Sequence, residues 1–234
     1  MTTLLIATRN AHKVGEIQAI LGPQFGCLTL NDFPAAPKVI EDADTFAGNA
    51  AKKAVELAKW LGHGAANANT LPEYVLADDS GLEVDALNGA PGVRSARFAA
   101  WDKTDNSPDA DNNAKLLRLL KDVPLEKRTG RFRCVIALVP VPKTHVESAS
   151  PVCYADEFAP HIFDGTCGGR VQLMPAGRGG FGYDPLFVPD GYAQSFAELG
   201  EDVKNKLSHR AKALAKMKQF FNNEGAKTRM NGPI

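Results

Sequence analysis

The sequence lacks the features of a disulfide-linked, zinc-binding or membrane-spanning protein. Its four cysteines, Cys27, Cys134, Cys153 and Cys167, form no C-x-x-C pair, and no histidine lies at zinc-ligand spacing, so we expect buried free thiols. No apolar run approaches the length of a membrane span, and the first residues lack the basic and long apolar segments of a signal peptide. We therefore expect a soluble, cytoplasmic protein.

A net charge is also lacking, because 27 Lys and Arg residues balance 27 Asp and Glu residues. This balance argues against nucleic acid or an anionic membrane as a partner. The charges are nevertheless segregated along the chain: eight basic and three acidic side chains lie in 201–234, whereas 32–44 is mainly acidic. An acidic and a basic patch together suit a metal-bound polyphosphate.

The hydrophobic pattern predicts a chain that mixes helices with strands. Strands are expected at 4–7, immediately before Asp78, at 131–139, at 152–158 and at 186–188. Helices are expected after Asn10, from Thr45 to about Gly62, around 116–120 and over 205–221. Helices and strands do not alternate regularly, and 131–158 suggests an antiparallel hairpin. The sequence therefore predicts an α/β fold with a mixed sheet rather than a doubly wound one.

The most informative run is 76–82, Leu-Ala-Asp-Asp-Ser-Gly-Leu, which predicts a strand that ends in a loop carrying chemistry. Adjacent side chains on a strand point to opposite faces, so Asp78 and Asp79 should have different roles. Glu41 and Asp79 lie on separate segments and could share a Mg²⁺ ion, while Asp79 could accept a proton from a water. The alternative is that Asp78 and Asp79 form a solvated turn and that Glu41 is a surface acid.

Three other groups of residues are candidates for binding. Thr8, Asn10 and Lys13 lie at the start of a helix, where an anion is favoured, although a helix cap with a solvated lysine is the alternative. In the glycine-dense loop 177–185, Phe181 could stack on a base and Asp184 could bond to it; a glycine-rich hairpin explains the loop equally well. The run 208–210, Ser-His-Arg, lies near Lys204 on a basic helix that could also be only a solvated face.

Taken in order, six motifs resemble those of the Ham1/RdgB family, the inosine/xanthosine triphosphate pyrophosphatases. They are T-x-N-x-x-K at 8–13, T-F-x-x-N-A-x-x-K-A at 45–54, A-D-D-S-G-L at 77–82, G-A-P-G at 89–92, G-G-F-G-Y-D-P at 179–185 and S-H-R at 208–210. The resemblance spans about residues 4–220. Six ordered motifs are far more specific than any single one.

The resemblance implies a single domain over 1–234 with two lobes around a curved mixed sheet, flanked by helices, and an active-site cleft between the lobes. It also implies a homodimer, a Mg²⁺ cofactor, and hydrolysis of ITP, dITP or XTP to the monophosphate and pyrophosphate. Within it Asp79 is the general base, and Asp79 and Glu41 are the metal ligands. The implied substrate-binding residues are Thr8, Arg9, Asn10, Lys13, Lys53, Ser80, Phe181, Gly182, Tyr183, Asp184, Lys204, His209 and Arg210.

Two positions depart from the family pattern, because Gly48 and Ile40 stand where relatives carry acids, which leaves Glu41 as the second metal ligand. The segment 101–113 is longer than in compact relatives and has no assigned role. Two alternatives stay open: a Maf-like pyrophosphatase for pyrimidine or modified nucleotides, and a nucleotide-binding module without catalysis. The motifs at 181–185 and 208–210 argue against the first, and the Asp79 carboxylate argues against the second.

Overall fold

The computed structural model describes residues 1–63, 71–100, 106–142 and 158–230. Six strands in these residues form one sheet in the order β2-β1-β3-β4-β5-β6. Three of them are parallel, namely β1 (Thr2–Ile6), β2 (Phe25–Thr29) and β3 (Tyr74–Val84). The sheet continues antiparallel from β3 through β4 (Thr129–Pro140), β5 (His161–Val171) and β6 (Phe187–Pro189). The expected mixed sheet is confirmed.

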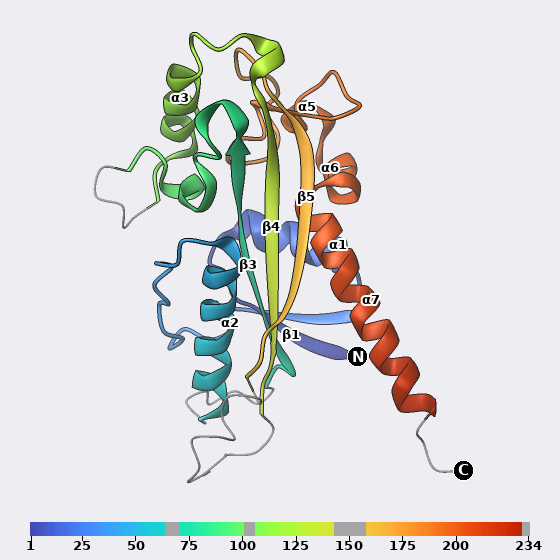
Figure 1. Ribbon diagram of the computed structural model, residues 1–234. Coiled ribbons are helices and arrows are strands. Elements are labelled where there is room, and N and C mark those ends of the chain that lie inside the picture. Colours follow the sequence, from blue (N-terminus) through green and yellow to red (C-terminus); the bar gives the residue numbers. More distant parts are fainter. Residues whose placement is uncertain (64–70, 101–105, 143–157, 231–234) are drawn as a thin grey trace.

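Helices cover both faces of this sheet (Figure 1). The helices are α1 (Ala11–Leu21), α2 (Phe46–Gly62), α3 (Asp109–Leu119), α5 (Phe196–Leu199), α6 (Glu201–Leu207) and α7 (His209–Met230), and the 3₁₀ turns are η1 (Asp85–Leu87), η2 (Gly92–Arg97) and η3 (Leu125–Lys127). In Figure 1 the long strands β3, β4 and β5 run side by side along the molecule, with α2 on one side and α7 on the other. The shorter helices α3, α5 and α6 gather at one end of these strands.

Alternation along the strands divides the core between the two faces. Val135, Ala137 and Val139 of β4 belong to the cluster that packs against α2. Cys134 and Ile136 belong to the cluster that packs against α1 and α7. Because both faces of β4 are buried from Cys134 to Val139, this part of the strand is a continuous apolar run.

The predicted starts of α1 and α2 are confirmed, whereas α3 begins at Asp109, seven residues before the expected start at about 116. Asn10 caps α1, with its Oδ1 accepting from the backbone N–H of Lys13, and Thr45 caps α2 in the same way through Gly48. The prediction of a single helix over 205–221 is wrong, because Ser208 has an extended backbone and separates α6 from α7. Its Oγ accepts from Ala211 N at 3.2 Å, so this serine begins α7.

One strand prediction is wrong, one strand is not predicted, and one expected strand lies almost wholly outside the described residues. The strand carrying Asp78 does not end in a loop there, since β3 continues to Val84 and pairs with β4 throughout. The sequence pattern does not predict β2 because it is a short, half-buried edge strand, and with it the first half of the chain does alternate as β-α-β-α-β. The partner of β4 is β5 at His161–Val171, and the strand expected at 152–158 falls almost wholly outside the described residues.

The described cysteines are free thiols, as expected: Cys134 and Cys167 are buried, Cys27 is half-buried, and Cys153 lies outside the described residues. In the described part of the chain, no helix combines the length and apolar character needed to cross a membrane. The cleft between two lobes stays a prediction.

Candidate active site

Asp78 and Asp79 lie in the middle of β3 and serve opposite faces of the sheet. They pair with Ile136 and Val135 of β4, respectively, and both are buried. The Asp78 carboxylate contacts residues of α1 and α7, whereas the Asp79 carboxylate contacts α2. The prediction that these neighbours point to opposite faces of the sheet is confirmed.

Asp78 is held by two cations. Its Oδ1 lies 2.6 Å from Lys13 Nζ, and its Oδ2 accepts from Arg210 Nε at 2.9 Å. Ser80 Oγ donates to Oδ1 at 2.9 Å and accepts from Arg210 Nη2 at 3.0 Å. Burial alone would raise the pKa of Asp78, but the charges of Arg210 and Lys13 hold that pKa well below its usual range. Asp78 is therefore an ionised anchor for the two cations.

Asp79 is in a different electrostatic state. Its Oδ2 accepts from Asn49 Nδ2 at 3.0 Å. Burial raises the pKa of Asp79 to about 6, Glu41 adds to the rise, and Lys13 and Lys53 oppose it. A carboxyl group with a pKa near neutrality is suited to accept and release a proton at physiological pH.

Glu41 approaches the same place from the loop before α2. Lys53 Nζ lies 2.6 Å from Glu41 Oε1 and also donates to the backbone carbonyl of Asp78 at 3.1 Å. Arg97 Nη2 donates to the backbone carbonyl of Glu41 at 3.2 Å. These contacts tie the loop of Glu41 to β3, so the structure brings Glu41, Lys53 and Asp79 together, as the family resemblance implies.

The donor set of Glu41 and Asp79 fits a Mg²⁺ ion. Mg²⁺ prefers hard oxygen ligands and often takes only one or two carboxylates, with waters and phosphate oxygens as the rest. A cation would also relieve the repulsion through which Glu41 raises the pKa of Asp79. Among the described residues no three His, Cys, Asp or Glu side chains are placed to hold a metal by themselves.

Residues 8–10, which precede α1, act partly as a helix cap. Thr8 Oγ1 accepts from Asn10 N at 3.2 Å, and Asn10 caps α1. Arg9 is exposed and donates to the carbonyl of Ala36 at 3.3 Å. The Lys13 side chain is only 18% exposed and pairs with Asp78, so Asn10 does cap the helix but Lys13 is not simply a solvated lysine.

The glycine-dense loop is organised around Asp184. Its Oδ2 accepts from Phe181 N at 2.9 Å and from Lys204 Nζ at 2.5 Å, and burial raises the pKa of this carboxyl despite Lys204. Lys204 Nζ also lies 4.4 Å from the centroid of the Phe181 ring. A Cβ at Gly180 would lie 2.2 Å from Asp184 Oδ2, and the φ of +72° there independently favours glycine.

Tyr183 and His209 are more deeply buried than residues that line a nucleotide pocket need to be. The Tyr183 ring packs in the core, and its hydroxyl donates to the carbonyl of Ser95 at 2.9 Å. The His209 ring stacks on Phe132 at 4.8 Å. Burial, with the Arg210 and Lys204 charges, holds the pKa of His209 well below its usual range, so the imidazole is neutral. His209 Nδ1 is buried and has no hydrogen-bond partner in the described residues.

Residues 4–220 match a family model described as the Ham1 family. This chain belongs to the Ham1 family. It is similar to the dITP/XTP pyrophosphatases of Desulforamulus reducens and Geobacter sulfurreducens, with 45% and 46% identity over 94% and 96% of this chain and 95% and 99% of theirs. The fold is similar to that of a HAM1 protein from Coxiella burnetii, with a TM-score of 0.74 and 32% identity over 95% of this chain and all of that one.

Within this Ham1 site, two residues lie outside the set that the sequence predicts. Glu16 accepts from Lys204 Nζ at 2.5 Å and from Arg210 Nη1, so it joins the two ends of the site. Asn49 accepts from Ala43 N at 2.9 Å while donating to Asp79. Helical spacing gives the signal for both, because Glu16 follows Lys13 by three residues and Asn49 precedes Lys53 by four.

Glu16 completes a buried chain of alternating charges. In order, the chain is Asp184, Lys204, Glu16, Arg210, Asp78 and Lys13. It links the glycine-dense loop to β3 through α6, α1 and α7. The alternative of a solvated basic face for Lys204 and Arg210 is therefore wrong, since their side chains are only 3% and 1% exposed.

At Gly48, where relatives carry an acid, the packing leaves no room for a side chain. A Cβ at Gly48 would lie 2.8 Å from the Cβ of Ala43, on the loop that Asn49 holds. No acidic side chain fits there without moving this loop. Ile40 is 68% exposed, which leaves Glu41 as the carboxylate that this loop directs towards Lys53 and Asp79.

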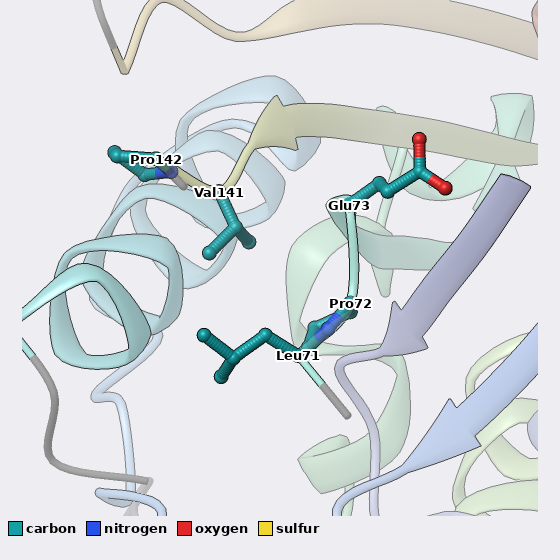
Figure 2. Close-up of a pocket in the computed structure, with 5 residues that line it drawn as sticks. All are labelled: Leu71, Pro72, Glu73, Val141 and Pro142. Carbon is teal, nitrogen blue, oxygen red and sulfur yellow. The ribbon is translucent and has the colours of Figure 1, made fainter. Parts of the chain in front are cut away.

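A separate pocket of about 340 Å³ lies where β3 begins and β4 ends (Figure 2). It is lined by Leu71, Pro72, Glu73, Val141 and Pro142. Glu73 and Val141 flank the first pairing of β3 with β4, five residues before Asp79. At about 3.3 Å per residue, this pocket is roughly 17 Å along the strand from Asp79 and forms no part of the carboxylate site.

Proposed function

We propose that the protein hydrolyses non-standard purine nucleoside triphosphates, namely dITP, ITP and XTP, to the monophosphate and pyrophosphate. The observation that carries this proposal is the Asp79 carboxyl, whose pKa is about 6 and which Asn49 orients beside Glu41 and Lys53. The names of the Ham1 relatives supply the substrate class. We further propose that the enzyme is a cytoplasmic homodimer.

The phosphate end of the substrate would lie between α1, α2 and β3. Lys13 and Lys53 supply positive charge, and Thr8, Arg9, Asn10 and Ser80 supply hydrogen-bonding groups. Glu41 and Asp79 would hold a Mg²⁺ cofactor, which when bound neutralises charge on the phosphate oxygens. The capped N-terminus of α1 adds the positive end of a helix dipole.

Asp79 acts as the general base in this scheme. The ionised carboxylate orients a water and takes one of its protons as the water oxygen bonds to the α-phosphorus. The bond from that phosphorus to the bridging oxygen of the β-phosphate breaks, and pyrophosphate leaves with the electron pair. Asn49 fixes the carboxylate by donating to Oδ2, so it positions the base rather than reacting.

The base end would use the glycine-dense loop and α7. The Phe181 ring stacks on the ring of the exposed His12, with centroids 5.3 Å apart, and a base would stack there in its place. Gly182, Asp184 and Lys204 keep the loop of Phe181 in place. Hypoxanthine and xanthine carry a 6-keto acceptor that donors from His209 or Arg210 can satisfy, whereas adenine carries an amino donor there. Adenine would leave the buried His209 donor unpaired, which can cost a factor of roughly 10⁴ or more in discrimination.

The test measures pyrophosphate release from dITP, ITP, XTP, ATP, GTP and dUTP, each with and without Mg²⁺. We expect release from the first three, dependence on Mg²⁺, and loss of at least about 10²-fold in kcat for Asp79→Asn. Asp164→Asn, which changes an exposed carboxylate paired with Lys216, is the matched control. Similar turnover of ATP and ITP, or release of orthophosphate alone, would overturn the proposal. Release from dUTP alone would favour the Maf-like alternative.

A further inference from the structure

The peptide that follows Phe181 is held from a helix distant in sequence. Gly182 N donates to Asp109 Oδ2 at 2.6 Å, and the Gly182 carbonyl accepts from Asn113 Nδ2 at 2.9 Å. Asp109 and Asn113 are four residues apart on α3, so their side chains share one face of the helix. Both polar groups of one glycine are thereby bound by one helix face.

This arrangement fixes the backbone on both sides of the Phe181 ring. Phe181 N donates to Asp184 Oδ2 at 2.9 Å, and the next N–H, that of Gly182, donates to Asp109. Gly182 has a φ of +62°, a conformation that favours glycine and sets the direction in which the chain leaves Phe181. The carboxylates of Asp184 and Asp109 therefore fix the backbone from which the Phe181 ring projects.

The helix that makes these contacts is itself anchored to the sheet. Asn112 Oδ1 accepts from Ala99 N at 2.7 Å, and its Nδ2 donates to the carbonyl of Ala96 at 3.2 Å, which ties α3 to η2. In η2, Ser95 Oγ accepts from Leu82 N of β3 at 2.9 Å. A continuous set of contacts thus runs from the strand of Asp79 to the peptide beside Phe181.

We propose that Asp109 and Asn113 are positioning residues that set the Phe181 ring for stacking on the substrate base. This inference rests on the proposed function and gives the first turns of α3 a role. A base stacks on an aromatic ring only when the two planes match, so release of Gly182 weakens substrate binding. The water, the α-phosphorus and Asp79 are not touched by this change, so the chemical step is preserved.

The test compares variants of matched shape and charge. Asp109→Ala removes the acceptor of Gly182 N, whereas Asp109→Asn keeps an oxygen acceptor. Asn113→Asp keeps the shape but sets an oxygen against the Gly182 carbonyl. Asp111→Ala is the control, because it removes the same charge from the same helix turn, and Asp111 is exposed.

In steady-state turnover of dITP, we expect Asp109→Ala and Asn113→Asp to raise KM by about tenfold with kcat within about twofold of wild type. Asp109→Asn and Asp111→Ala should keep the wild-type KM. An unchanged KM in Asp109→Ala and Asn113→Asp would overturn the inference. So would a fall in kcat at constant KM.

A second measurement separates this inference from the proposed function. Hydrogen exchange at the Gly182 amide, followed by NMR without nucleotide, should be slow in wild type and in Asp111→Ala and at least about tenfold faster in Asp109→Ala. Unchanged exchange in Asp109→Ala would refute the inference even if dITP is a good substrate. If the Gly182 amide exchanges slowly in wild type but wild type does not hydrolyse dITP, the proposed function is refuted instead.

Discussion

Arg210 Nε donates a 2.9 Å hydrogen bond to Asp78 Oδ2, across 132 positions of the chain. Neither side chain is more than 1% exposed. Arg210 also contacts Glu16 and Ser80, so it joins α7, α1 and β3 at one point. This pair therefore holds the start of α7 against the strand that carries Asp79.

Removal of the Asp78 charge should destabilise the fold strongly. Asp78→Asn leaves the buried Arg210 and Lys13 cations without their carboxylate, which costs about 3–5 kcal/mol of unfolding free energy at pH 7. The pKa of Asp78 is depressed in the folded state, so its contribution is present above the ordinary value of 3.8 and is lost as the pH falls further. The measured difference between wild type and variant should shrink below that pH.

Urea unfolding between pH 3 and pH 8 measures this difference. Asp42→Asn is the control, since Asp42 forms an exposed pair with Lys52 at 2.7 Å and its loss should change stability little. Equal stability of the two variants at pH 7 would contradict the assignment of Asp78 as a buried anchor.

Loss of the Asp79 charge should have the opposite effect on stability. The pKa of Asp79 is raised from 3.8 to about 6 in the folded state, so its stabilising contribution is complete below 3.8 and is lost as the pH rises through about 6. At about 1.4 kcal/mol per pH unit, the ionised carboxylate costs up to about 3 kcal/mol at pH 8. We expect Asp79→Asn to recover this free energy at pH 8, with no gain at pH 4, while abolishing turnover.

The measurement is urea unfolding in EDTA, so that no metal compensates the carboxylate. Asp164→Asn should show no gain at either pH, because its carboxylate is exposed and paired with Lys216. A variant Asp79→Asn that is less stable than wild type at pH 8 would refute the raised pKa as the cause.

The Mg²⁺ requirement should depend on Glu41. Glu41→Gln keeps the size of the side chain but removes its charge, so the Mg²⁺ concentration for half-maximal pyrophosphate release should rise by about tenfold or more. The neighbouring Asp42 points to Lys52 instead, so Asp42→Asn should leave the Mg²⁺ titration unchanged. An unaltered titration for Glu41→Gln would exclude Glu41 as a metal ligand.

Close packing of α7 on β5 should depend on Gly165. A Cβ there would lie 2.0 Å from the carbonyl oxygen of His209 and 2.5 Å from Ala213 N, which are backbone atoms that cannot rotate away. Gly165→Ala should therefore lower the unfolding free energy by about 1–3 kcal/mol and, by displacing the start of α7, reduce turnover of dITP.

Gly15→Ala is the control for Gly165→Ala, and thermal unfolding and dITP turnover are measured for both variants. It lies in α1, and a Cβ added there would meet no neighbouring group within 4 Å, so Gly15→Ala should stabilise by about 0.5–1 kcal/mol and leave turnover unchanged. A Gly165→Ala variant as stable and active as Gly15→Ala would show that the close approach of α7 is not needed.

Local patterns in the sequence are sufficient to predict several parts of the structure. Asn10 and Thr45 predict helix starts because a cap is a contact within four residues. The alternation of Cys134 and Ile136 predicts the shared face of β4. The six motifs predict the family, and Glu41, Lys53 and Asp79 do come together.

Other features depend on partners that local sequence does not reveal. The run at Asp78 predicts a strand end because two carboxylates and a glycine are poor strand formers. β3 nevertheless continues, since Arg210 and Lys13 neutralise Asp78, and Gly81 lies against the backbone of Gly92, where a Cβ would be only 2.6 Å from the Gly92 carbonyl oxygen. The residues of β2 and β5 do not predict these strands, because β2 is a short, half-buried edge strand and β5 contains three glycines, which are poor strand formers.

The family and the mixed sheet follow from the amino-acid sequence, as does the proposal that Asp79 is the reactive carboxyl, because short-range periodicity and ordered motifs carry that information. The charge states follow from the packing of distant segments instead. Asp78 and Asp79 have the same side chain and adjacent positions, yet two cations depress the pKa of one while burial raises the pKa of the other to about 6. That difference arises from Lys13, Arg210 and burial against α2, α1 and α7, which no local pattern encodes.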